Sequence, residues 1–242
     1  MKERVAIVTG GTGALGRFIV MKLSDLGIKV YVPSRTIEDF NNVFDQSQQN
    51  NSEEYKPRKI FSFVCDATDE KSVCGFVQNV ASQENGKIDY LINTVGGIGP
   101  PKKVIDLSTA ELDNIININF KSTFFFTIET LKRMAINHFG RIISIGAIAG
   151  LETSPERFAY SFSKAGVINL MDTISEEMKD MNIRCNTIIP SIIDTPSNRE
   201  WGSSEDIKKW VRPEEVAEII LSLISENISS IRSSHLKIYG AY

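Results

Sequence analysis

A tyrosine and a lysine four residues apart, Tyr160 and Lys164, are the side chains in this sequence best suited to proton transfer. Residues i and i+4 of an α-helix lie on one face about a turn apart, so the lysine ammonium can approach whatever the tyrosine hydroxyl approaches. A free tyrosine has a pKa of about 10, and a neighbouring positive charge lowers it. The spacing therefore predicts that Lys164 lowers the pKa of Tyr160 and that Tyr160 acts as a general acid or base.

The rest of the chain has to show whether a site is built around this pair, because the same spacing also occurs on helices that simply face solvent. With 242 residues the chain is long enough for one large α/β domain with a buried core. The net charge of -3 comes from 27 basic and 30 acidic residues that form no basic stripe, so nucleic acid is not an expected partner.

No targeting or membrane segment is evident, and the pattern predicts a soluble, cytoplasmic protein. The first residues contain only a short apolar run, which fits neither a signal peptide nor a membrane span. The three cysteines and two histidines have no metal-ligand spacing, so we expect reduced core thiols and no metal site.

A glycine-rich turn follows the first apolar run, Val5-Ala-Ile-Val8, and reads Thr9-Gly-Gly-Thr-Gly-Ala-Leu-Gly16. The run is typical of a buried parallel strand, and a helical period follows the turn. Backbone N–H groups at a helix N-terminus bind a pyrophosphate where side chains are absent. Strand, turn and helix together fit the general dinucleotide fingerprint; a merely structural turn is the alternative.

Ser34 and Arg35 follow the second predicted strand, over residues 28–32, where an NAD-binding fold usually has an acidic residue on the ribose. An arginine accepts a 2′-phosphate through charge-assisted hydrogen bonds. We therefore expect NADP(H) to be favoured over NAD(H). A solvated loop charge is the alternative for Arg35.

Later strands also end in groups that could face a ligand. Asp66 and Ala67 follow the predicted strand 60–65, and a carboxylate there lies on the ligand side of such a sheet, although Asp66 could instead cap a helix. Glycines follow Asn93 at the end of the strand 88–93. Asn119 lies inside a helix predicted over 108–136, where asparagine is unfavourable, so it has either a specific role or a solvated, helix-bending one.

Strands alternate with helices along the whole chain, with three further strands predicted over 141–145, 183–189 and 236–239. This alternation predicts a single-domain α/β Rossmann fold over 1–242, with a doubly wound, seven-stranded parallel sheet. The polar stretch 45–54 is expected to be an exposed loop. Residues 191–211, with Trp201 and Trp210, have the length of a substrate lid.

The ordered motifs resemble the short-chain dehydrogenase/reductase family over essentially the whole chain. The match comprises Thr9-Gly10 through Gly16, Asp66, Asn93 through Gly96, Asn119, Tyr160 with Lys164, and Pro190-Ser191 with Thr195. The resemblance implies an NAD(P)-dependent oxidoreductase of a small molecule with Tyr160, Lys164 and Asn119 as catalytic residues. It also implies that Lys164 holds the nicotinamide ribose and that Asn119 helps to order a proton-relay water.

The same resemblance implies a set of cofactor contacts and an assembly. The expected cofactor-binding residues are Gly10, Thr12, Gly13, Leu15, Gly16, Ser34, Arg35, Asp66, Ala67, Asn93, Gly96, Tyr160, Lys164, Pro190, Ile193 and Thr195. A homodimer or homotetramer is expected to form through the helices that carry Asn119 and Lys164.

Ala147 is a departure from the family pattern, because it stands thirteen residues before Tyr160, where the family's catalytic serine belongs. Ser144, three residues earlier, is not expected to replace that hydroxyl. Losing one such donor costs about 2.7–4 kcal/mol of transition-state stabilisation. Ordinary ketone reduction would suffer from this loss.

Two alternatives therefore stay open. The first is a reductase similar to quinonoid dihydropteridine reductase, a branch of the family that normally lacks the serine and resembles residues 140–215, notably Asp194 to Arg199 and Trp210. Arg35 departs from the acidic residue usual in that branch. The second is a cofactor-binding sensor without catalysis, suggested by Ala147 together with Ala14 and Ser191 at glycine positions of the family.

Overall fold

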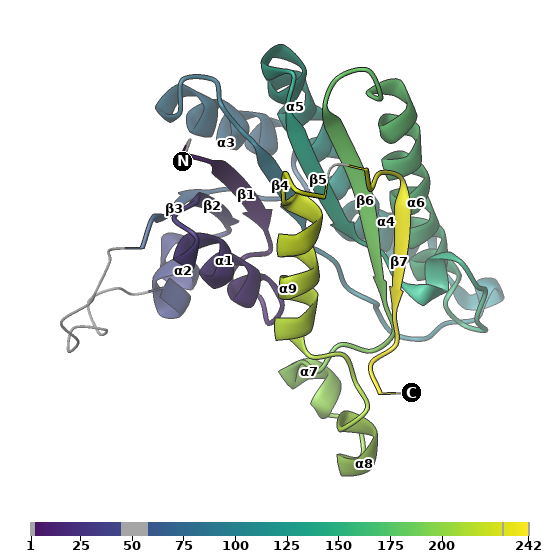
Figure 1. The fold of residues 1–242 in the computed structure, drawn as a ribbon. Helices are drawn as coiled ribbons and strands as arrows, with labels where there is room; N and C mark the ends of the chain where they lie inside the picture. Colours follow the sequence, from purple (N-terminus) through teal and green to yellow (C-terminus); the bar gives the residue numbers. More distant parts are fainter. Residues whose placement is uncertain (1–2, 45–57, 229, 242) are drawn as a thin grey trace.

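All strands of the structure, a computed structural model that describes residues 3–44, 58–228 and 230–241, form one parallel sheet (Figure 1). Their order is β3-β2-β1-β4-β5-β6-β7. The strands are β1 (Val5–Thr9), β2 (Lys29–Ser34), β3 (Ile60–Val64), β4 (Tyr90–Asn93), β5 (Gly140–Ile145), β6 (Ile183–Pro190) and β7 (Ser234–Ile238). This confirms the predicted single-domain Rossmann-type fold. The loop predicted over 45–54 lies outside the described residues.

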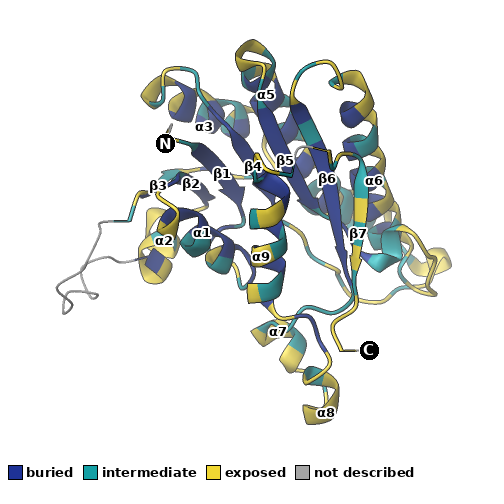
Figure 2. Cartoon of the chain, in the orientation of Figure 1, coloured by how far each residue is buried: buried dark blue, intermediate teal, exposed yellow. Residues whose placement is uncertain are grey.

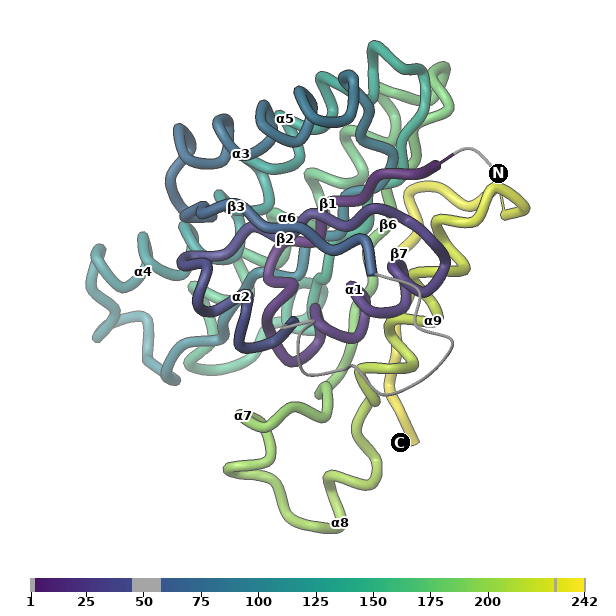
Figure 3. The backbone as a smooth tube through the Cα atoms, turned by 90° about the vertical axis from the view of Figure 1, so that its left-hand side faces the viewer, coloured from purple at the N-terminus to yellow at the C-terminus, as the bar shows by residue number. Residues whose placement is uncertain are grey.

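Helices cover both faces of the sheet, as Figures 1 and 3 show. One face packs on α1 (Gly16–Asp25), α2 (Ile37–Phe44) and α9 (Pro213–Ile224), and the other packs on α3 (Glu70–Gln83), α5 (Ser122–Asn137) and α6 (Phe158–Glu177). Each face therefore has its own apolar core. The central strands between the two cores are dark blue in Figure 2, whereas the edge strand β7 is partly exposed. The apolar run of β1 is buried at every position because both of its faces are covered.

The strand order reverses between β1 and β4, and this reversal positions the site. From β1 the chain builds toward β2 and β3, then returns to place β4 on the other side of β1. The connections leaving β1 and β4 therefore diverge, and a ligand crevice is expected beyond the carboxyl ends of these strands. The register pairs Thr9 with Asn93 and Asn93 with Ser144, so these residues form one row at that edge.

The long helix predicted over 108–136 is present, but it is not a regular α-helix. It consists of α4 (Thr109–Ile116), a π-helical segment (Asn117–Lys121) and α5. Ser108 caps its start, and its side chain accepts a hydrogen bond from the Glu111 N–H. Asn119 lies in the π segment, and such segments occur frequently at functional sites.

The predicted lid also contains regular structure. Two short helices, α7 (Pro196–Arg199) and α8 (Ser204–Ile207), lie beyond the carboxyl ends of β6 and β7, next to the N-terminal end of α9 (Figure 1). The isolated pairing of Ile193 with Val211 closes the base of this segment. None of the helices in the described part of the chain is both long and apolar enough to cross a membrane.

Candidate active site

The glycine turn after β1 packs directly against the residues that follow β4. Gly10 has a φ of +64°, and a Cβ built there would lie 2.9 Å from Thr94 Oγ1. A Cβ on Gly16 would lie 2.1 Å from the Gly10 carbonyl oxygen. The Thr94 hydroxyl donates to the Thr9 carbonyl at 2.6 Å, which ties the turn to the β4 exit. The backbone is therefore bare and close-packed where the sequence predicts a dinucleotide.

The other residues predicted for this turn have local structural roles. The Gly13 N–H donates to the Gly10 carbonyl at 2.9 Å, and Leu15 precedes the first residue of α1 with its side chain buried in the core. Thr12 is half-buried and Gly13 is exposed. The turn thus leaves its central backbone open to a ligand while its ends are anchored.

Ser34, at the carboxyl end of β2, is buried, and its hydroxyl has no hydrogen-bond partner among the described residues. Arg35 is exposed beside it. Hydrogen bonds from Thr68 hold the pKa of the Asp66 carboxyl below its usual range, and Arg35 adds to this effect. Asp69, not Asp66, caps α3. The structure therefore brings Arg35 and Asp66 together at the edge where a ribose is expected.

Asn119 is fully buried, which excludes the solvated alternative. Its side-chain oxygen accepts a hydrogen bond from the Gly97 N–H at 3.1 Å, and its amide nitrogen donates to the Gly97 carbonyl at 2.8 Å and to the Ile115 carbonyl at 3.0 Å. The Asn119 side chain therefore binds both the N–H and the carbonyl of Gly97, and so fixes the loop after β4.

Lys164 is buried, and its ammonium donates a hydrogen bond to the Ile145 carbonyl at 2.8 Å. Burial lowers the pKa of Lys164 to about 8. A Cβ built on Gly96 would lie 2.8 Å from Asn119 Oδ1 and 3.2 Å from Lys164 Nζ. Three residues from separate parts of the sequence, Gly96, Asn119 and Lys164, thus meet at one point beyond the sheet.

Tyr160 lies one turn before Lys164 on α6, with the ammonium 6.0 Å from the centre of its ring. Burial raises the pKa of Tyr160 to about 12, and the charge that opposes this increase belongs to Arg157. The prediction that Lys164 lowers the pKa of Tyr160 was therefore wrong. The spacing gave the correct face of the helix, but burial of the phenol outweighs the charges around it.

Ala147 is buried just beyond β5, where it precedes a short 3-10 turn. Ser144 is fully buried; its hydroxyl accepts from Asn93 Nδ2 at 3.1 Å and donates to Met171 Sδ at 3.2 Å. Ser144 is thus committed to the sheet interior and does not replace the missing hydroxyl, as expected. Asn93 Oδ1 is buried without a hydrogen-bond partner in the described structure.

A cavity of about 110 Å³ lies beside Tyr160. Its walls come from residues 98–115 and 156–160, not from the predicted lid. Arg157 also lines it and donates to the Gly99 carbonyl at 3.0 Å. Arg157 was missed by sequence reasoning, although its position three residues before Tyr160 on a helical pattern could have revealed a second nearby cation.

The remaining predicted residues are spread over the sheet edge and the lid segment. Ala67 is half-buried after β3, and Pro190 is the buried last residue of β6. Thr195 caps α7, and its hydroxyl accepts from the Asn198 N–H. Trp201 is exposed, and its ring centre lies 5.1 Å from that of the buried Trp210. The two tryptophans therefore pack on each other within the lid segment.

Comparison with known proteins gives one consistent picture. The family model described as short chain dehydrogenase matches residues 4–206. The 3-oxoacyl-[acyl-carrier-protein] reductase FabG of Thermotoga maritima is 27% identical, over 99% of this chain and 98% of its own. The crystal structure of gox2181 has a TM-score of 0.88 at 24% identity, covering 98% and 95% of the two chains. A variant of the actinorhodin polyketide ketoreductase, solved with NADPH, has a TM-score of 0.86 at 25% identity, covering 98% and 96%.

Proposed function

The chain belongs to the short chain dehydrogenase family of NAD(P)-dependent oxidoreductases, and from this premise we propose that it is an NADP(H)-dependent reductase of a small carbonyl or conjugated-ring compound. The observation that carries the proposal is the meeting of Gly96, Asn119 and Lys164 at one point, one helical turn from Tyr160.

The residues at this edge fit a nicotinamide dinucleotide. The glycine turn offers bare backbone for the pyrophosphate, and the unpartnered hydroxyl of Ser34 and the guanidinium of Arg35 suit a phosphorylated ribose. Lys164 has hydrogen-bonding capacity beyond its bond to Ile145 for the second ribose. When bound, the cofactor supplies the hydride.

Tyr160 serves as the proton donor in this proposal. Because burial raises its pKa to about 12, the phenol stays protonated across the physiological range and suits the reductive direction. Arg157 lies where it favours the phenolate left after proton transfer. Asn119 fixes the backbone of the loop at Gly97. The family resemblance implies that Asn119 also helps to order a proton-relay water.

Ala147 favours a second candidate substrate class. The relatives named above include a 3-oxoacyl reductase and a ketoreductase, which supports a carbonyl substrate. The missing hydroxyl at Ala147 supports instead a conjugated ring such as a quinonoid dihydropterin, because that substrate needs a proton from Tyr160 but less polarisation. A third reading, a cofactor-binding sensor, is disfavoured by the presence of Tyr160, Lys164 and Asn119 together.

The deciding experiment measures NADPH oxidation on a panel of ketones, aldehydes, quinones and quinonoid dihydropterin. We expect Tyr160→Phe to lower kcat by at least about 100-fold with little change in NADPH affinity, because only the proton donor is removed. Tyr239→Phe, at an exposed position after β7, is the matched control and should keep full activity. Unchanged turnover in Tyr160→Phe would refute the proposed role, and tight NADPH binding without turnover on the whole panel would favour the sensor.

We also propose a homodimer or homotetramer formed through α5 and α6. Two stacked rings, Phe158 and Phe162, are 46% and 56% exposed on α6, and Phe124 is exposed on α5. Exposed aromatic residues on neighbouring helices are typical of a contact surface. Light scattering should give a mass two or four times that of one chain, and a monomer would contradict the assembly.

A further inference from the structure

A second cavity, of about 370 Å³, lies at the opposite end of the sheet from the candidate active site. It opens at the amino end of β6, between the end of α6 and the segment that leads into β7. Its lining residues are Lys179, Asp180, Asn182, Ile183, Arg184, Ser230 and Arg232. Arg184 and Pro190 stand near opposite ends of β6, roughly 20 Å apart at 3.3 Å per residue.

Arg184 is the unusual residue of this cavity. Its guanidinium takes part in no hydrogen bond or ion pair among the described residues, and its Nε is closed off from solvent without an acceptor. Leaving a buried donor unsatisfied costs free energy, more so when the group is charged. A ligand that accepts hydrogen bonds would remove that cost.

The neighbouring strand places a second guanidinium beside Arg184. Arg141 of β5 stands in direct register with Arg184, and its side chain is fully buried. Its own hydrogen bonds go to the Gly140 carbonyl and to Asn182. Burial, and next the charge of Arg184, lower the pKa of Arg141 to about 10. Like charges directly opposite each other on adjacent strands repel.

The acidic groups around the cavity do not neutralise these cations. Asp180 is the carboxylate in the wall, and it makes no ion pair with Arg184 within the described residues. Glu176 approaches both Lys179 and Arg232, but only at 3.9 Å in each case. Lys179, Arg184 and Arg232 thus line one cavity, and Arg184, the most buried of the three, has no ion-pair partner in the described part of the chain.

We propose that this cavity binds the phosphate group of a small molecule through Arg184, Arg232 and Lys179. Phosphate oxygens accept paired hydrogen bonds from guanidinium groups, and a doubly charged anion would offset the repulsion between Arg141 and Arg184. The volume leaves room for the rest of a phosphorylated molecule beside the anion.

Calorimetric titration with inorganic phosphate, at constant ionic strength held with chloride, tests the site. We expect Arg184→Gln to weaken phosphate binding by at least about tenfold, because charge-assisted hydrogen bonds are lost. Arg133→Gln, at a partly exposed position of α5 that does not line the cavity, is the matched control and should bind as the natural protein does. Phosphate could also bind near Arg35, so Arg35→Gln is titrated in parallel; loss of binding there, with binding kept in Arg184→Gln, would overturn the proposal.

Thermal melting provides a second measurement that does not depend on activity. Without phosphate, Arg184→Gln should melt no lower than the natural protein, since the substitution removes the repulsion with Arg141. With phosphate, the melting temperature of the natural protein should rise, while that of Arg184→Gln should not. Equal increases in both proteins, or none in either, would refute the site.

Discussion

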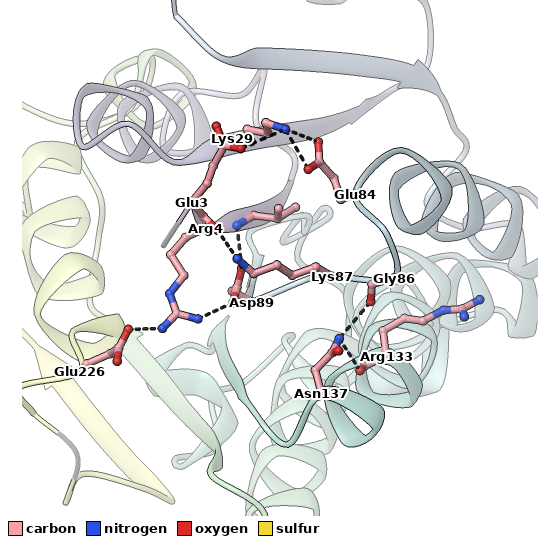
Figure 4. Close-up of polar contacts among 11 residues, drawn as sticks. Glu3, Arg4, Lys29, Glu84, Gly86, Lys87, Asp89, Arg133, Asn137 and Glu226 are labelled. Carbon is pink, nitrogen blue, oxygen red and sulfur yellow. Dashed lines mark hydrogen bonds and ion pairs between the residues drawn. The ribbon is translucent and has the colours of Figure 1, made fainter. Parts of the chain in front are cut away.

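The two ends of the sheet differ in whether their buried polar groups have partners. At the amino end of β1, β2 and β4, Arg4 pairs with the buried Asp89 at 2.6 Å, and Asp89 also accepts from the Val5 N–H at 2.8 Å. Lys29 pairs with Glu84 at 2.9 Å (Figure 4). At the carboxyl end, Ser34 Oγ and Asn93 Oδ1 are buried without partners in the described structure.

This difference separates groups that stabilise the fold from groups held ready for a ligand. Buried polar atoms are normally hydrogen-bonded, and an exception calls for an explanation. At the amino end the chain supplies the partners itself, because Arg4 and Asp89 precede adjacent central strands. At the carboxyl end the strand order separates the loops, and a ligand crevice is expected beyond these strands. The Nε atoms of Arg141 and Arg184, at the amino ends of β5 and β6, are exceptions, because both are buried without a partner among the described residues.

The largest expected effect comes from breaking the paired end with Asp89→Ala. The substitution leaves the Val5 N–H without its acceptor and removes a buried carboxylate from Arg4 and Lys87. We expect the free energy of unfolding to fall by about 3 kcal/mol, the lower end for breaking a buried ion pair.

Urea denaturation measures this loss. Asp113→Ala, at an exposed position of α4, is the control and should unfold like the natural protein. A loss for Asp89→Ala no larger than the control's would show that the amino end is not held by this network.

A smaller effect of opposite sign is expected from Lys164→Met at the ligand end. The folded-state pKa of Lys164 is about 8 against 10.5 for the free side chain, so the buried charge costs about 3 kcal/mol below pH 8 at 1.36 kcal/mol per unit. Losing the bond to Ile145 costs about 1 kcal/mol. We therefore expect the cofactor-free variant to be about 2 kcal/mol more stable near pH 7.

The gain should depend on pH in a defined direction. Between pH 8 and 10.5 the unfolded chain binds more protons than the folded one, so the natural protein becomes relatively more stable as pH rises through this window. The advantage of Lys164→Met should disappear there, whereas Lys121→Met, at an exposed position, should show no such change. An advantage of equal size at both ends of this window would rule out the buried charge as its cause.

The smallest effect sharpens the cofactor assignment. Arg35→Gln should raise the Kd for NADPH by about tenfold and leave the Kd for NADH unchanged, because only NADPH carries the 2′-phosphate. Fluorescence titration with both cofactors measures the two constants, with Arg133→Gln as the control. An equal loss of affinity for both cofactors would mean that Arg35 does not bind the 2′-phosphate.

The sequence was enough to predict the elements whose signal is local. The apolar run Val5–Val8 and the glycines after it predicted β1, its turn and α1, because burial on both faces and bare backbone leave clear patterns. The spacing of Tyr160 and Lys164 gave their common helix. The π segment around Asn119 could not be read, since the inserted residue changes the hydrogen bonding without changing the apolar stripe.

The pKa of Tyr160 and the cavity around Arg184 could not be predicted from the sequence for a different reason. The pKa of Tyr160 depends on how deeply the phenol is buried. The cavity beside Tyr160 is lined partly by the loop after β4, which is far from Tyr160 in the sequence. The cavity around Arg184 likewise gathers side chains from the end of α6, from β6 and from the segment before β7. The strand order brings these side chains together, and the strand order cannot be inferred from residue spacing in the sequence.

The position of β1 between β2 and β4 also determines when β1 gains its two partner strands during protein synthesis. Thr9 exchanges hydrogen bonds with Thr94, 85 residues later in the chain. At a translation rate of about 5–20 residues per second, the β4 side of β1 waits roughly 4–17 s for its partner. During that interval β1, whose first four residues are apolar, has only β2 as a neighbouring strand. Because an unpaired apolar strand edge promotes aggregation, we expect the growing chain to be most vulnerable before β4 has been synthesised.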